Sequence, residues 1–151
     1  QSGFAGGGGD ASPYKMVRIE LNYLGDLKMS AKHGPSGAVI KTAAPVDNEG
    51  DGSSFSPTDL TATSLGACMS TIMGILAKRH YWDITGLKCT VDKEMIADPH
   101  RRIGKLIVDF VCDKEIPPEA QTILEKGALT CPVIHSLNPK IEVVTNFKWK
   151  S

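Results

Sequence analysis

Alternating apolar and polar side chains mark the first part of the chain. Ile19, Leu21 and Tyr23 are separated by polar residues, the period of a strand with one buried face. The turn signals Gly25-Asp26 and His33-Gly34-Pro35-Ser36-Gly37 divide this segment from two further apolar stretches. The pattern therefore predicts a three-stranded meander.

A long apolar segment without this alternation follows. It opens with Ser56-Pro57-Thr58-Asp59, which offers a capping residue, proline at the first helical position and an early carboxylate. Apolar positions then recur at helical spacing to about Arg79, and the 18 residues from Leu60 to Ala77 carry no charge. Their serines, threonines and glycines are too polar for a lipid-spanning helix. We therefore expect a buried helix, whose enclosure on nearly all sides suggests that a second subunit helps to cover it.

Two alternating segments after this helix predict a hairpin that turns at Asp98-Pro99-His100-Arg101. A symmetric hairpin is expected to set three pairs opposite each other: Val91 and Phe110, Met95 and Leu106, Cys89 and Cys112.

Helix and strand signals complete the chain. Pro117-Pro118-Glu119 opens a second helix that Lys126-Gly127 closes, and Thr130-Cys131-Pro132 starts a short third helix with Thr130 as its cap. Alternating apolar residues from Ile141 to Trp149 predict a last strand. The order βββ-α-ββ-αα-β lacks a βαβ rhythm, which places the chain in the α+β class.

The composition is typical of a soluble globular protein and favours no polyanionic partner. Hydrophobic residues make up 41% of the 151 residues, and 17 basic side chains balance 17 acidic ones, so neither nucleic acid nor a membrane surface is expected as a partner. The glycine-rich segment 1–15 is interpreted as a flexible leader before a single domain at 16–151. Without a recognisable secretory signal or dense cysteines, a cytoplasmic location is expected.

Two of the four cysteines are candidates for chemistry. Cys131 falls at a predicted helix start, where unpaired backbone N–H groups stabilise a thiolate and lower its pKa. Cys68 lies inside the long helix and needs a cation, a hydrogen-bond donor or another helix end to ionise. By position alone, each is either a core thiol or a reactive one. Cys89 and Cys112 lie on apolar strand faces and are interpreted as reduced core cysteines.

Other kinds of site find less support. Cys131 and His135 stand one helical turn apart, but two ligands are too few for zinc, and no Cys-x-x-Cys or His-x-x-x-His partner occurs. His135 is interpreted instead as a polar residue that lines the same cleft or faces solvent. A Gly-x-Ser-x-Gly elbow and a glycine-rich phosphate loop are also missing. We expect neither a metal nor a cofactor.

Three motifs occur in order along the chain: Phe55-Ser56-Pro57-Thr58-Asp59-Leu60, Ser64-Leu65-Gly66-Ala67-Cys68 and Cys131-Pro132-Val133. With their spacing, and with Ile84-Thr85-Gly86-Leu87 after the helix, they resemble the OsmC-like family of osmotically induced protein C and organic hydroperoxide resistance proteins. The resemblance extends over nearly all of residues 16–149. It implies an intertwined α+β homodimer, with two long central helices wrapped by sheets and two active sites at the subunit interface.

The resemblance also implies a chemistry. In hydroperoxide-reducing members, the first cysteine, here Cys68, is the peroxidatic thiolate. The second, here Cys131, resolves the resulting sulfenic acid as a disulfide, which an external dithiol reduces. The expected function is thus peroxiredoxin-like, thiol-dependent reduction of organic hydroperoxides. The alternative is a non-enzymatic protein that binds a small apolar ligand at the dimer interface.

The chain departs from the family pattern around the first cysteine. Hydroperoxide-reducing members carry a glutamate ten residues before it, where this chain has Thr58, followed by Asp59. They also use an arginine from the early strands, where this chain offers Arg18. We therefore expect a less characterised branch of the family, with Thr58, Asp59, Arg18 and His135 as candidate supporting residues for Cys68.

Overall fold

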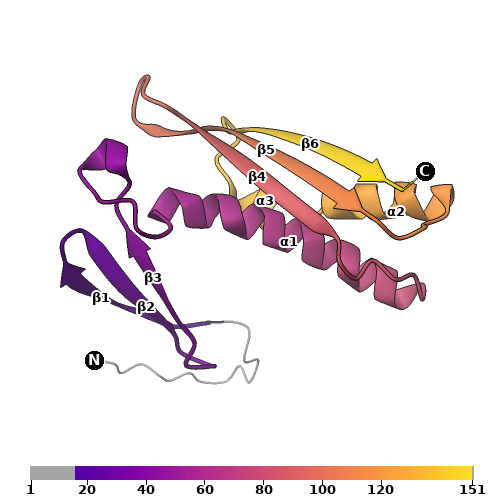
Figure 1. Ribbon diagram of the computed structural model, residues 1–151, viewed down its shortest axis with the longest axis horizontal. Coiled ribbons are helices and arrows are strands. Elements are labelled where there is room, and N and C mark those ends of the chain that lie inside the picture. Colours follow the sequence, from indigo (N-terminus) through magenta and orange to yellow (C-terminus); the bar gives the residue numbers. More distant parts are fainter. Residues whose placement is uncertain (1–15, 151) are drawn as a thin grey trace. The chain divides into compact units, whose positions relative to one another are not determined.

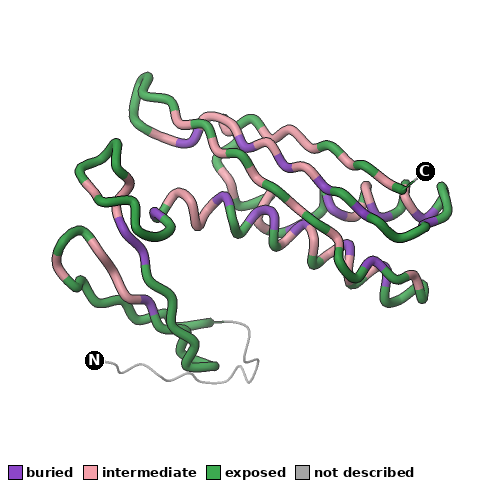
Figure 2. The backbone as a smooth tube through the Cα atoms, viewed as in Figure 1, coloured by how far each residue is buried: buried purple, intermediate pink, exposed green. Residues whose placement is uncertain are grey.

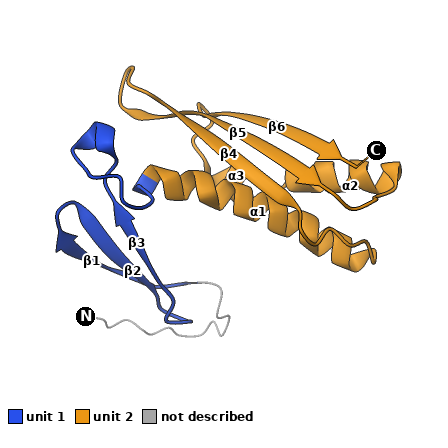
Figure 3. Ribbon diagram, viewed as in Figure 1, with its two compact units in different colours: residues 1–57 blue, residues 58–151 orange. Residues whose placement is uncertain are grey.

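The computed structural model describes residues 16–150, so the leader predicted at 1–15 lies outside the described residues. The element order is βββ-α-ββ-αα-β as predicted, with one added 3-10 turn at Val46–Asn48 (Figure 1). Figure 3 shows that the described residues form two compact units, one that ends at Pro57 and one that begins at Thr58. Sheets and helices are mixed as the α+β class requires.

The first unit is an antiparallel sheet of β1 (Ile19–Gly25), β2 (Lys28–His33) and β3 (Val39–Ala43). Asp26 and Leu27 link β1 to β2, both with positive φ, as a two-residue hairpin turn matched to the strand twist requires. The register sets Leu21 opposite Ala31, and Ala31 opposite Ile40. These three residues therefore share one face of the sheet.

That face of the first unit is apolar and largely open. Leu21 is 56% exposed, Tyr23 63% and Ile40 51%. The intervening residues of β1, Glu20 and Asn22, point to the other face and are polar. A sheet with one apolar face normally packs that face against a second layer.

The second unit has one sheet and three helices. Its elements are α1 (Pro57–Arg79), β4 (Lys88–Ile96), β5 (Arg102–Cys112), α2 (Pro118–Ala128), α3 (Pro132–Ser136) and β6 (Glu142–Trp149). The strand order is β4-β5-β6, with β4 antiparallel to β5, and β5 parallel to β6. Since α2 and α3 link β5 to β6, this part is a βαβ crossover, which the sequence analysis did not predict.

The core of this unit lies between the sheet and its helices. β5 contributes Leu106, Val108 and Phe110, all fully or almost fully buried, and they pack with Leu65 and Met69 of α1. Figure 2 shows buried positions recurring along both β5 and α1. The helices thus cover one face of the sheet.

The long helix forms as predicted, but the other elements of its unit do not enclose it. Thr63, Ala67, Thr71 and Ile75 are exposed and recur every fourth residue, so they form one open stripe along α1. By length and composition alone, α1 is the one helix of the described chain that could cross a membrane, and a third of its most apolar window is buried here. The predicted cover by a second subunit is not tested by a single chain.

The hairpin of β4 and β5 pairs differently from the prediction. Val91 lies opposite Val108, and Cys89 lies opposite Phe110 rather than Cys112. Up to Glu94 the strands pair about a point between Pro99 and His100, one residue earlier than expected, so these partners move by two residues. A bulge after Glu94 then sets Met95 opposite Ile103 rather than Leu106. A register shift of two residues leaves each side chain on the same face of the sheet, so the side chains that face the core are still those expected.

Candidate functional site: the thiol pair

Packing of α2 against α1 brings two distant cysteines together. Ile72 and Leu76 follow Cys68 by one and two turns on the same side of α1. Gly127, in the last turn of α2, lies directly against this side, because an added Cβ there would collide with Leu76 Cδ1 and stand 3.8 Å from Ile72 Cγ2. Cys131 follows Gly127 by four residues, and its thiol interacts with that of Cys68.

Cys131 is the N-cap residue of α3. Its backbone is extended, Pro132 takes the first helical position, and Cys131 Sγ accepts the backbone N–H of Ile134 at 3.3 Å. The cap predicted at Thr130 is therefore wrong by one residue. Thr130 instead donates its Oγ1 hydroxyl to the carbonyl oxygen of Gly127 at 2.7 Å.

The pKa of the Cys131 thiol is raised above its usual value. Burial is the largest cause, because it disfavours the charged thiolate, and the Cys131 side chain is fully buried. The hydrogen bond from the Ile134 N–H lowers the pKa, but by less than burial raises it. Cys68 raises the pKa further through a hydrogen bond and through charge. The lowered pKa predicted from the helix start is thus wrong, since position in a helix does not reveal burial.

Cys68 is the more accessible of the two thiols. It is half-buried, whereas none of Cys131 is exposed. Both are reduced in this structure. A reagent from solvent therefore meets Cys68 first.

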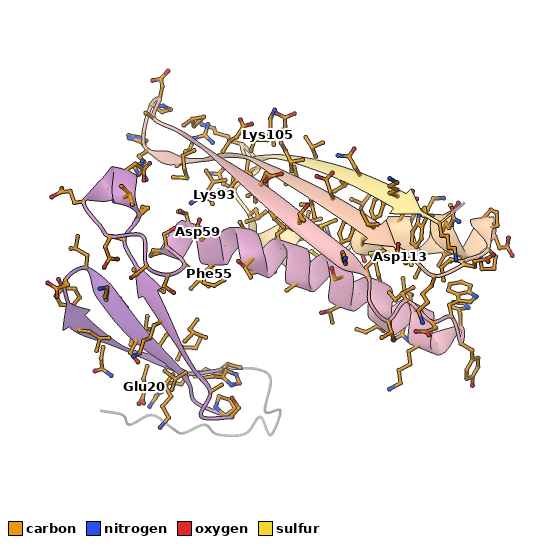
Figure 4. The ribbon with its side chains drawn as sticks, viewed as in Figure 1. Glu20, Phe55, Asp59, Lys93, Lys105 and Asp113 are labelled. Atoms are coloured by element: carbon orange, nitrogen blue, oxygen red, sulfur yellow. The ribbon has the colours of Figure 1, made fainter. Side chains whose placement is uncertain are left out.

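Thr58 and Asp59 contact a lysine that the sequence analysis did not single out. Lys93 of β4 places Nζ 2.8 Å from Thr58 Oγ1 and 2.8 Å from Asp59 Oδ1 (Figure 4). Its side chain is only 16% exposed. The sequence pattern could have identified this lysine, because Lys93 occupies a core-side position between Val91 and Met95 in the alternating strand.

The cluster of Lys93, Thr58 and Asp59 does not reach Cys68 of the same chain. Asp59 precedes Cys68 by nine residues of α1, about 14 Å at the rise of an α-helix. Of the other predicted supporting residues, His135 has an exposed side chain one turn after Cys131, and Arg18 belongs to the first unit. Thr58 and Asp59 are therefore not brought to the thiols by their own unit.

Cys89 and Cys112 pack as core residues, as predicted. Cys112 belongs to the buried core of the second unit, and Cys89 is half-buried and packs against that core. Cys89 Sγ lies 3.9 Å from the carbonyl oxygen of Gly66, where β4 crosses α1. Burial raises the pKa of the Cys89 thiol, which makes it a poor nucleophile.

Two further features bear on ligands. Among residues 16–150, no group of three or more His, Cys, Asp or Glu side chains could hold a metal ion. An open cavity of about 530 Å³ lies beside the C-terminal half of α1, lined by residues that include Ser70, Gly74, Lys78 and Trp82. Neither Cys68 nor Cys131 lines it, so the cavity is separate from the thiol pair.

Comparison with known proteins gives the family. A sequence model of the OsmC-like protein family matches residues 50–146, more than half of the chain. A Psychrobacter arcticus 273-4 protein, provisionally described as an osmotic stress induced and detoxification response protein, is 44% identical. The match covers 87% of this chain and 96% of that one, with a TM-score of 0.83.

More distant structures share the fold. The organic hydroperoxide resistance protein OsmC of Legionella pneumophila is 14% identical, with a TM-score of 0.72 over 91% of this chain and 99% of that one. The OsmC-like protein of Mycoplasma pneumoniae is 15% identical, with a TM-score of 0.75 over the same shares. No curated protein matches the sequence significantly. The family match and the Psychrobacter structure together place this chain in the OsmC-like protein family.

Proposed function

We propose that this protein reduces organic hydroperoxides with thiols, with Cys68 as the attacking residue and Cys131 as the resolving one. The observation that carries the proposal is that Cys68, 63 residues before Cys131 in the sequence, raises the pKa of the Cys131 thiol, and that both cysteines are free. Proteins of the same fold from Legionella pneumophila and Elizabethkingia anophelis are named organic hydroperoxide resistance proteins, which supports the choice of substrate class.

The first step joins sulfur to oxygen. The Cys68 thiolate attacks one oxygen of the peroxide, the O–O bond breaks, and the other oxygen takes a proton and leaves in the alcohol. Cys68 is oxidised to a sulfenic acid, and the hydroperoxide is reduced. Partial exposure of Cys68 supports this role, since the substrate arrives from solvent.

The second step joins the two sulfurs. Cys131 attacks the sulfenic sulfur of Cys68, an S–S bond forms, and the hydroxyl group leaves as water with the thiol proton. The Ile134 N–H at Cys131 Sγ favours the negative charge that develops during this attack. An external dithiol then donates two electrons, restores both thiols and becomes a disulfide itself.

We also propose a homodimer in a reducing cytoplasm. The open apolar face of the β1–β3 sheet and the open stripe on α1 are the kinds of surface that a second copy covers. OsmC-like proteins are typically dimeric, which supports the same assembly. A cytoplasmic location suits the chemistry, because the disulfide must return to two thiols in each cycle.

Steady-state kinetics test the function. Wild-type protein with a dithiol reductant should consume cumene hydroperoxide, and Cys68→Ser should abolish consumption. Cys131→Ser should retain a single turnover and lose the sustained rate, whereas Cys89→Ala, in the core but outside the pair, should stay close to wild type. A wild-type rate no higher than that of Cys68→Ser would end the proposal.

A further inference from the structure

We infer that Gly127, through its contact with Leu76, is a positioning residue for the thiol pair: a side chain at this position would displace the Leu76 side chain and disturb the packing of α2 on α1. The inference rests on the proposed thiol chemistry, because it concerns how Cys68 and Cys131 are kept within bonding range.

The conformation of Gly127 gives no reason for a glycine. Glycine inside a helix costs about 1 kcal/mol relative to alanine. Four described glycines have positive φ, at 25, 37, 52 and 86, and Gly127 is not one of them. α2 also ends on Leu129 in the right-handed helical region, so Gly127 is not needed to terminate the helix. The remaining reason is space.

The space is taken by side chains of α1, Leu76 above all. An added Cβ at Gly127 would collide with Leu76 Cδ1, and it would meet Leu76 Cγ at 3.6 Å and Ile72 Cγ2 at 3.8 Å. Both residues lie on the Cys68 side of α1, one and two turns further along. The contact at Gly127 therefore falls on the side of α1 that carries Cys68.

A hydrogen-bonded segment links this contact to Cys131. The Gly127 carbonyl oxygen accepts both the backbone N–H of Thr130, at 2.9 Å, and its hydroxyl, at 2.7 Å. Cys131 follows directly and is held in turn by the Ile134 N–H at its sulfur. A shift of the last turn of α2 is thus passed on to the Cys131 thiol.

Disulfide geometry makes the pair sensitive to such a shift. The Cα atoms of bonded cysteines are usually about 4.4–6.8 Å apart, with a narrow range of S–S torsion, so a displacement of about 1 Å strains the bond. Gly127→Ala should therefore weaken the Cys68–Cys131 disulfide without changing either sulfur.

The test measures the equilibrium constant for forming the Cys68–Cys131 disulfide in glutathione redox buffers. The reduced and oxidised fractions are determined by alkylation and mass spectrometry. Gly127→Ala should lower this constant by about tenfold, which raises the reduction potential by about 30 mV. Gly74→Ala is the matched control, because a Cβ there meets no atom within 4 Å. It should stay within about twofold of wild type.

A compensating change separates positioning from general destabilisation. Leu76→Ala removes the methyl group with which the added Cβ at position 127 collides, so the double variant Leu76→Ala/Gly127→Ala should match Leu76→Ala alone within about twofold. This comparison also serves if Gly127→Ala by itself does not fold. A constant for Gly127→Ala equal to that of wild type, or a tenfold loss that persists in the double variant relative to Leu76→Ala, would overturn the inference.

The glutathione equilibrium uses no hydroperoxide, so a failure of the proposed function can be distinguished from a failure of the inference about Gly127. A wild-type protein that forms the disulfide but consumes no hydroperoxide would end the proposed function and leave the role of Gly127 in place. An active enzyme in which Gly127→Ala changes nothing would end only the inference. A wild-type pair that never forms the disulfide would contradict both.

Discussion

Ile134 donates its backbone N–H to Cys131 Sγ at 3.3 Å, at a sulfur with no exposed surface. The hydrogen bond favours a thiolate and burial opposes it, and burial is the stronger effect. Cys68, by contrast, is partly open to solvent. The two thiols therefore differ in access, which leads to a simple expectation for chemical labelling.

In the reduced protein, iodoacetamide should modify Cys68 before Cys131. A reagent needs contact with the sulfur, and Cys131 is fully buried with a raised pKa, so we expect a rate difference of about tenfold or more. Peptide mapping after timed labelling measures both rates in one sample. Cys112, also buried, is an internal control for slow reaction. Equal labelling of Cys68 and Cys131 would contradict this description of the site.

The raised pKa of Cys131 also predicts a dependence of stability on pH. Its neutral thiol is favoured in the folded state, so its contribution is fully present below the unfolded pKa of about 8.5. That contribution is lost as pH rises through the folded pKa, because the unfolded chain releases the proton first.

Urea unfolding at pH 8 and at pH 9.5 measures this loss. The free energy of unfolding should fall more in wild type than in Cys131→Ala. Part of the fall should remain in the variant, since burial raises the pKa of Cys89 as well. A steeper fall in Cys131→Ala than in wild type would show that the sign is wrong.

Lys93 should contribute to stability at the start of α1. Lys93→Met removes an ammonium group that bonds both Thr58 and Asp59 and is only 16% exposed, so we expect a loss of about 1–3 kcal/mol. Lys105→Met is the matched control, because its ion pair with Glu142 is 3.8 Å long and more exposed, with an expected effect below about 0.5 kcal/mol. Both are measured by chemical denaturation, and equal losses would refute the distinction.

The open face of the β1–β3 sheet should carry subunit association. Leu21→Asp places a charge on the apolar face, which is 56% exposed at this residue in the single chain, and should shift the protein toward monomers. Asn22→Asp introduces the same carboxylate one residue later, on the opposite face of the sheet, and should leave the molar mass of the dimer in solution unchanged. Light scattering coupled to size exclusion reads both variants. A dimer that tolerates Leu21→Asp would require another interface.

Local patterns predicted the order and type of the elements well. The periods of 2 and 3.6 residues, with the helix signals at Ser56-Pro57, placed every strand and helix in its correct order. The hairpin register was missed by two residues, because periodicity fixes faces and leaves the centre of a turn open. The parallel pairing of β5 with β6 was missed for a similar reason, since alternation does not name a strand's partner.

The site was predicted less completely. Cys68 and Cys131 were identified as a pair through short motifs, and the structure places their thiols in interaction. The direction of the Cys131 pKa shift depends on burial, which only the packed fold reveals. Lys93 could have been found, because a lysine at a core-side strand position needs a partner.

Disulfide mapping after one equivalent of cumene hydroperoxide tests the central claim most directly. Reduced protein is treated under denaturant-free conditions, quenched by alkylation, digested and examined by mass spectrometry. We predict one new linked peptide pair, joining Cys68 to Cys131, with Cys89 and Cys112 still alkylated and no such product in Cys68→Ser. Four alkylated cysteines with the hydroperoxide intact, or a linkage that excludes Cys68, would contradict the account.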